Sequence, residues 1–193
     1  MPVTLVTGPV RSGKSRYVLE LARPVKGRVR YVATAIRDAD DGEWNTRLQR
    51  HMQDRPPNWE SVETAELGHE ALLEVFRGCS PDECIVVDAL GTWIAARIAT
   101  HIELFEQDFA RFEAMMDAQA AQLATAMLQC DARVLVVAEE VGWDIVPVAA
   151  SARLFRDVLG RMKQRLAAEA DAAYLVVCGF ALDLRSLGRT IES

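Results

Sequence analysis

The sequence has few of the residues that build metal centres and disulfide frameworks. Its 193 residues include four cysteines and three histidines, and no two cysteines form a C-x-x-C pair. Zinc sites and disulfide scaffolds need such ligands at short, regular spacing. We therefore expect neither, and we interpret the cysteines as small buried apolar residues in a reducing cytoplasm. They are Cys79, Cys84, Cys130 and Cys178.

Long apolar runs and an excess of positive charge are also missing. No stretch approaches the ~20 uncharged apolar residues that a membrane span requires. The apolar segment 3–7 has no basic residue before it, unlike a signal peptide. Lys and Arg number 22 against 28 Asp and Glu, a net charge of −6 that argues against sequence-independent DNA binding. We expect a cytoplasmic protein with no membrane span and no nucleic-acid partner.

Short apolar runs alternate with longer amphipathic segments along the chain. The runs are of strand length and apolar on both faces, which is typical of a parallel sheet buried on both sides. We expect strands over residues 3–7, 29–33, 84–87, 134–138 and 174–178. We expect helices over residues 14–21, 43–54, 67–76, 105–128 and 149–170. This alternation predicts an α/β fold with a mostly parallel central sheet flanked by helices, and the lack of repeats or linker composition predicts one domain over residues 1–193.

The last long helix carries a cluster of basic residues. They are Arg153, Arg156, Arg161, Lys163 and Arg165. Two interpretations stay open at this point: a solvated face that forms ion pairs with the acidic surface, or one or two side chains that reach a phosphate.

Residues 8–15 read G-P-V-R-S-G-K-S and match the P-loop pattern G-x-x-x-x-G-K-[ST] between a predicted strand and a predicted helix. In such a loop, backbone N–H groups and the helix N-terminus hold phosphate oxygens. Lys14 then bridges the β- and γ-phosphates, and Ser15 offers its hydroxyl to Mg²⁺. We predict a P-loop NTPase-like fold with Mg²⁺ as cofactor. The predicted phosphate-binding residues are Gly8, Pro9, Val10, Arg11, Ser12, Gly13, Lys14 and Ser15.

Asp88 ends the predicted strand I-V-V-D, as a Walker B carboxylate does. A role near Mg²⁺ and an ordinary helix-capping role both fit this pattern, and the upstream P-loop favours the first.

One histidine has polar neighbours at helical spacing. Glu43, Arg47 and His51 are four residues apart and share one helix face, while Pro56 is expected to end the helix before Arg55. From spacing alone, this face either forms exposed ion pairs or faces a nucleotide. The other histidines, His69 and His101, are interpreted as surface or capping residues.

Together these segments resemble the bifunctional adenosylcobinamide kinase / adenosylcobinamide-phosphate guanylyltransferases of cobalamin biosynthesis, over nearly the whole chain. The most specific segment is R-L-Q-R-H51-x₃-R-P-x₂-W, placed after Y-V-A-T. The resemblance implies two reactions: phosphorylation of the aminopropanol hydroxyl of adenosylcobinamide with ATP or GTP, then transfer of GMP from GTP to the new phosphate. The second reaction passes through a GMP–histidine intermediate and gives adenosylcobinamide-GDP, and the matching residue is His51.

The resemblance also implies binding residues outside the P-loop. They are Ala33, Thr34, Ala35, Met52, Gln53, Asp54, Arg55, Glu63 and Asp88. We expect His51, Lys14 and Asp88 to be catalytic, and we hypothesise that Glu63 reads the N1 and N2 edge of guanine. A homo-oligomer, a trimer, is implied as well. Trp93 and Ile94 could supply its interface or belong to the core.

Four positions depart from the pattern that this family often shows. Pro9 stands where a glycine is usual, Gly91 where a threonine is usual, and Glu139 and Lys163 where asparagines are usual. Because two of these changes replace a neutral amide by a charge, they bear on substrate choice and on the kinase step. Two other functions fit the P-loop: a single-function small-molecule kinase in which His51 orients substrate, and a non-enzymatic nucleotide switch.

Overall fold

The computed structural model describes residues 3–36, 40–64, 68–189 and 191, which form a seven-stranded sheet with the strand order β3-β2-β4-β5-β1-β6-β7. Neighbouring strands are parallel except for the antiparallel pair β6–β7. The strands are β1 (Val3–Gly8), β2 (Val29–Ala33), β3 (Glu60–Glu63), β4 (Cys84–Asp88), β5 (Arg133–Glu139), β6 (Ala172–Val177) and β7 (Phe180–Asp183). The predicted α/β fold with a mostly parallel sheet is confirmed.

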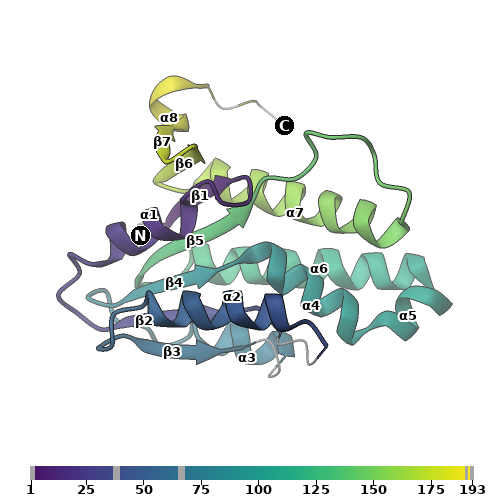
Figure 1. Cartoon of the computed structure of the whole chain (residues 1–193), viewed down its shortest axis with the longest axis horizontal. Helices are drawn as coiled ribbons and strands as arrows, with labels where there is room; N and C mark the ends of the chain where they lie inside the picture. Colours follow the sequence, from purple (N-terminus) through teal and green to yellow (C-terminus); the bar gives the residue numbers. More distant parts are fainter. Residues whose placement is uncertain (1–2, 37–39, 65–67, 190, 192–193) are drawn as a thin grey trace.

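Helices cover both faces of the sheet (Figure 1). They are α1 (Lys14–Ala22), α2 (Gly42–Gln53), α3 (Gly68–Glu74), α4 (Leu90–Thr100), α5 (Ile102–Gln107), α6 (Phe109–Leu128), α7 (Ala150–Glu169) and α8 (Leu184–Leu187). Alternate residues of β4 enter opposite cores: Ile85 packs with α3, α4, α6 and α7, and Val86 packs with α1. The interior strands β1, β4 and β5 are mostly apolar because both of their faces are buried. No helix in the described ranges has the length and apolarity to cross a membrane.

The sequence did not predict α4, although Trp93 and Ile94 in it are buried. The two strands that it did not predict are polar or exposed. β3 has the sequence E-S-V-E and β7 is largely exposed, so neither shows the apolar run of a buried strand. The helix expected over residues 105–128 is two helices. Asp108 separates them and caps α6, because its side chain accepts a hydrogen bond from the backbone N–H of Arg111 at 3.0 Å.

Several expectations about single residues were wrong. His69 is buried rather than at the surface, and its Nε2 donates a hydrogen bond to Gln122 at 3.0 Å. Cys178 is exposed, because it lies in the tight turn between β6 and β7 with φ at 51°. For Trp93 and Ile94 the sequence left an interface and the core open, and the structure shows the core, because both side chains are buried.

The strand order brings the carboxyl ends of four strands to one edge. Gly8 of β1 lies opposite Glu139 of β5, and Ala33 of β2 lies opposite Asp88 of β4. In open parallel sheets, ligands bind at this edge. The P-loop follows β1 there.

Candidate active site

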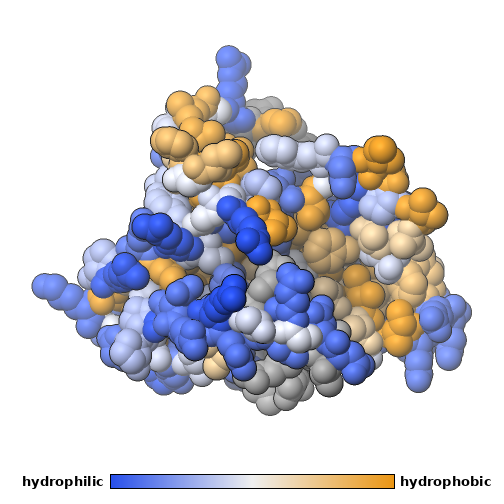
Figure 2. Space-filling view, in the orientation of Figure 1, coloured by the Kyte–Doolittle hydropathy of each residue, from blue (hydrophilic) through white to orange (hydrophobic). Residues whose placement is uncertain are grey.

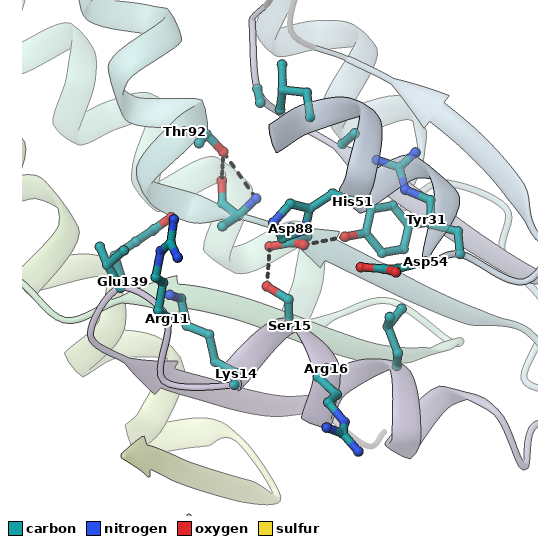
Figure 3. A pocket seen from close by; sticks show the side chains of 18 of the residues that line it. Arg11, Lys14, Ser15, Arg16, Tyr31, His51, Asp54, Asp88, Thr92 and Glu139 are labelled. Atoms are coloured by element: carbon teal, nitrogen blue, oxygen red, sulfur yellow. Dashed lines mark hydrogen bonds between the residues drawn. The ribbon is translucent and has the colours of Figure 1, made fainter. Parts of the chain in front are cut away.

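A cavity of about 750 Å³ opens at the carboxyl edge of the sheet (Figure 3). It gathers the P-loop, the ends of β2 and β4, and the helix α2. Twelve residues predicted from the sequence line it: Val10, Arg11, Ser12, Gly13, Lys14, Ser15, Ala33, Ala35, His51, Asp54, Arg55 and Asp88. Segments that are far apart in the sequence therefore meet in one site.

The P-loop has the curled backbone that anion binding requires. Arg11 and Gly13 have positive φ angles of 58° and 100°, and the second is the N-cap of α1. An added Cβ at Gly8 would lie 2.3 Å from the carbonyl oxygen of Val176, so only glycine fits there. In this structure the Lys14 ammonium donates to the carbonyl oxygen of Pro9 at 3.2 Å. The loop thus presents backbone N–H groups, a helix N-terminus and a lysine to one place.

The oxygens of Asp88 connect the P-loop with β2. Oδ1 accepts a hydrogen bond from the Ser15 hydroxyl at 3.5 Å, and Oδ2 accepts one from the phenol of Tyr31. Burial, followed by the charge of Asp88, raises the pKa of Tyr31 well above its usual value, so the phenol stays a donor. A hydroxyl and a carboxylate oxygen at this separation are ligands of the kind that Mg²⁺ prefers. The donor set therefore fits the expected cofactor.

Arg55 follows α2 and reaches back over β2 and β3. Its guanidinium carbon lies 4.0 Å from the centre of the Tyr31 ring, and its Nη1 donates to Ser61 and to Glu63 at 3.1 Å each. The side chain is only 8% exposed, yet its Nε has no partner. A buried guanidinium with a free N–H at the cavity wall is suited to hold an anion.

His51 is exposed on α2, among the side chains that line the cavity in Figure 3. The helix begins after Asp41, whose carboxylate accepts a hydrogen bond from the backbone N–H of Trp44 at 2.8 Å, and it ends before Pro56 as expected. None of the described side chains of α2 is buried. His51 therefore stands on a helix whose described side chains are exposed or half-buried.

Six other predicted residues do not line the cavity: Gly8, Pro9, Thr34, Met52, Gln53 and Glu63. Some of them support residues that do. Thr34 is an example of such support. Its hydroxyl donates to the carbonyl oxygen of Ala89 at 2.6 Å and accepts from the backbone N–H of that residue at 3.0 Å. These bonds fix the turn after Asp88. Glu63 is about half exposed and pairs with Arg55.

The cavity also has walls that the sequence did not predict: Arg16, Leu19, Arg23, Tyr31, Trp44, Leu48, Ala89, Thr92 and Glu139. The helix that follows the P-loop, α1, contributes Arg16 and Leu19, and Arg23 directly follows its last residue. Their spacing of three and four residues places them on one helix face, so the sequence could have predicted that they face the cavity. The basic cluster of α7 does not reach the cavity. Instead, Arg161 pairs with Asp117 at 2.6 Å, which favours the ion-pair interpretation.

These features define a P-loop nucleotide-binding protein with a histidine in the lining of the same cavity. The sequence over residues 4–184 matches the family described as "Cobinamide kinase / cobinamide phosphate guanyltransferase". The chain belongs to this family.

Curated relatives agree over nearly the whole length. "Bifunctional adenosylcobalamin biosynthesis protein CobU" of Salmonella typhimurium is 35% identical over 94% of this chain and 98% of its own. The CobU protein of Escherichia coli is 33% identical over the same shares. Among solved structures, an ATPase of a bacterial type III secretion system has a TM-score of 0.57 and 10% identity over 98% of this chain. The chain spans 59% of that ATPase, and the likeness concerns the fold alone.

Proposed function

We propose that this chain phosphorylates the aminopropanol hydroxyl of adenosylcobinamide with ATP or GTP and then transfers GMP from GTP to adenosylcobinamide phosphate, giving adenosylcobinamide-GDP. Its membership of the cobinamide kinase / guanyltransferase family supports both reactions. The single observation that carries the proposal is that one cavity is lined by both a P-loop and His51. A P-loop alone would support phosphoryl transfer, and the histidine adds a nucleophile.

For the kinase reaction, the P-loop N–H groups and Lys14 hold the triphosphate and offset the charge that develops on it. Ser15 and Asp88 would hold Mg²⁺, which supplies charge neutralisation between the phosphates when bound. Arg55, which also lines the cavity, offers its unpartnered Nε to a phosphate oxygen. The acceptor hydroxyl must then approach in line with the bond that breaks.

For the guanylyl reaction, a neutral ring nitrogen of His51 attacks the α-phosphorus of GTP. An N–P bond forms, the bond to the β-phosphate oxygen breaks, and pyrophosphate leaves. A phosphate oxygen of adenosylcobinamide phosphate then attacks the same phosphorus, and the N–P bond breaks to return the imidazole. Two in-line displacements replace one difficult transfer. The attack uses the lone pair of the neutral ring nitrogen.

We also propose that the protein acts as a homo-oligomer, a trimer, in a reducing cytoplasm. Exposed apolar side chains support the oligomer. They gather in two places in Figure 2: over β7 and α8, and along the loop between β5 and α7. In that loop Ile145 is 91% and Val148 is 97% exposed. Such patches on a protein surface commonly mark association sites.

Labelled GTP tests the proposed function. The protein is incubated with Mg²⁺ and GTP labelled at the α- or the γ-phosphorus, and adducts are mapped by peptide mass after denaturation. We expect an acid-labile, base-stable α-label on His51 that is lost in His51→Ala and kept in His101→Ala, because His101 lies outside the cavity lining. An α-label that is missing from protein that still binds GTP would exclude the histidine intermediate. Turnover of γ-phosphate would then separate a plain kinase from a nucleotide switch.

A further inference from the structure

Glu139, at the end of β5, is a carboxylate of the cavity to which no role has yet been given. Its Oε2 accepts a hydrogen bond from the backbone N–H of Gly91 in the first turn of α4, at 2.8 Å. Glu139 lines the cavity, and Figure 3 shows it beside Arg11 and Lys14. The side chain is therefore anchored at the phosphate end of the site.

The local structure is shaped around this carboxylate. A Cβ added at Gly91 would lie 2.3 Å from Glu139 Oε2, so a larger residue there would displace it. Lys163 lies on the opposite side of the strand end, with its ammonium 3.2 Å from the carbonyl oxygen of Glu139 and 2.6 Å from Glu140 Oε1. Glu139 thus contacts two of the other three departures from the family pattern, Gly91 and Lys163.

Two carboxylates next to each other on β5 have different environments. Glu140 is engaged by Lys163 and by the hydroxyl of Thr7, which donates to the same oxygen at 2.8 Å. Glu139 has a backbone N–H instead of an ion pair. Burial raises the pKa of Glu139 above its usual value, and Lys14 opposes that rise. A carboxylate with a raised pKa is a better proton acceptor than an ordinary one.

The other described carboxylates that line the cavity are less suited to take a proton from a substrate hydroxyl. Both oxygens of Asp88 are already engaged, by Ser15 and Tyr31. Asp54 follows α2, and in Figure 3 it lies beyond Asp88 as seen from Glu139. Of the described carboxylates in the cavity lining, Glu139 is the one that stands beside Lys14, the lysine that holds the terminal phosphates in P-loop enzymes.

We propose that Glu139 is the general base of the phosphoryl transfer, accepting the proton of the acceptor hydroxyl as that oxygen attacks the γ-phosphorus. One O–P bond forms, the bond between the γ-phosphorus and the β,γ-bridging oxygen breaks, and the hydroxyl proton passes to the Glu139 carboxylate. The nucleoside diphosphate leaves, and the proton returns to solvent. This inference rests on the proposed function. It assigns to Glu139 the activation of the acceptor hydroxyl in the kinase reaction. In the guanylyl reaction Glu139 has no part.

Separate assays of the two reactions test it. Kinase turnover is measured as γ-phosphate transfer to adenosylcobinamide at saturating nucleotide, and the guanylyl reaction as α-label on His51. Glu139→Gln should lower kinase kcat by about 10²-fold or more, the usual contribution of a general base. The GMP–histidine yield and the affinity for GTP should change by less than about 3-fold, because neither needs proton removal from the acceptor.

Two further variants make the result interpretable. Gly91→Ala keeps the Glu139 carboxylate but displaces it, and should lower kinase turnover while leaving the guanylyl reaction unchanged. If Glu139→Gln does not bind nucleotide, the Gly91→Ala variant provides the test instead. Glu140→Gln removes the same charge at the neighbouring residue, whose side chain does not line the cavity. This variant should leave kinase kcat within a few-fold of wild type. Full kinase turnover in Glu139→Gln, or an equal loss of both reactions, would overturn the inference. Wild-type protein that performs neither reaction would overturn the proposed function itself.

Discussion

The phenol of Tyr31 on β2 donates a hydrogen bond to the carboxylate of Asp88 at the end of the neighbouring strand β4. The guanidinium of Arg55 lies over the same phenol ring, so one aromatic side chain connects the predicted metal ligand with the predicted anion site. Tyr31 was not among the predicted site residues, because a tyrosine in an apolar strand is usually a core residue. Its position suggests that it sets the orientation of both charged groups.

Replacing Tyr31 with Phe tests this arrangement. The ring under Arg55 remains, while Asp88 loses one donor, so we expect weaker Mg²⁺-dependent nucleotide binding, by about 10-fold, the scale of one charged hydrogen bond. Titration of nucleotide binding against Mg²⁺ measures the change. Tyr174→Phe, which alters a tyrosine packed on Tyr17 outside the cavity lining, serves as control and should bind normally. An unaltered Mg²⁺ dependence in Tyr31→Phe would contradict the orienting role.

Arg55 should not tolerate exchange for lysine. Lysine keeps the charge but loses the planar group that stacks on Tyr31 and the fork of N–H donors. We expect Arg55→Lys to lower the rate of His51 guanylylation by about 10- to 100-fold, nearly as much as Arg55→Ala. Rapid-quench measurement of α-label incorporation gives the rates. Wild-type rates in the lysine variant would show that charge alone is sufficient.

The recognition of guanine by Glu63 remains a prediction. The structure also gives Glu63 a second role. Glu63 also pairs with Arg55 at 3.1 Å, so Glu63→Gln could weaken all nucleotides through that arginine. We expect the ratio of GTP to ATP affinity to fall in Glu63→Gln, because a carboxylate accepts both N–H bonds of the guanine edge and an amide oxygen accepts them less well. Competition binding with both nucleotides measures this ratio. If both affinities drop equally, Glu63 acts only through Arg55.

Buried His69 makes stability depend on pH. Burial lowers its pKa below the usual 6.5, so the folded protein keeps the ring neutral while the unfolded chain binds a proton. The free energy of unfolding therefore falls as the pH drops from above about 6.5 toward the lowered folded pKa. Urea unfolding at about pH 7.5 and about pH 5.5 should show a smaller loss in His69→Gln than in wild type. Burial, followed by Arg97, also lowers the pKa of His101, so part of the loss persists in the variant. An equal loss in both proteins would exclude His69 as a source.

The parts of the molecule that the sequence predicts well are those with a strong local signal. The buried strands are apolar over their length, and the P-loop has a fixed spacing, so both could be placed within a residue or two. The walls of the cavity have no such signal. Tyr31 and Glu139 reach the site because strand order places β2 and β5 beside β4 and β1. That order is a long-range property that no short segment encodes. The burial of His69 was missed because its polar sequence neighbours do not show that α6 packs over the ring and that Gln122 on α6 accepts its hydrogen bond.

The helix α2 presents His51 with none of its described side chains buried, whereas the P-loop follows the interior strand β1, whose residues are all buried. The two reacting groups therefore belong to regions with different free energies of local opening. Native-state amide hydrogen exchange should be fast in α2 and slow in β1. Under the proposed function, such a difference would let His51 move relative to the P-loop while a nucleotide stays bound there.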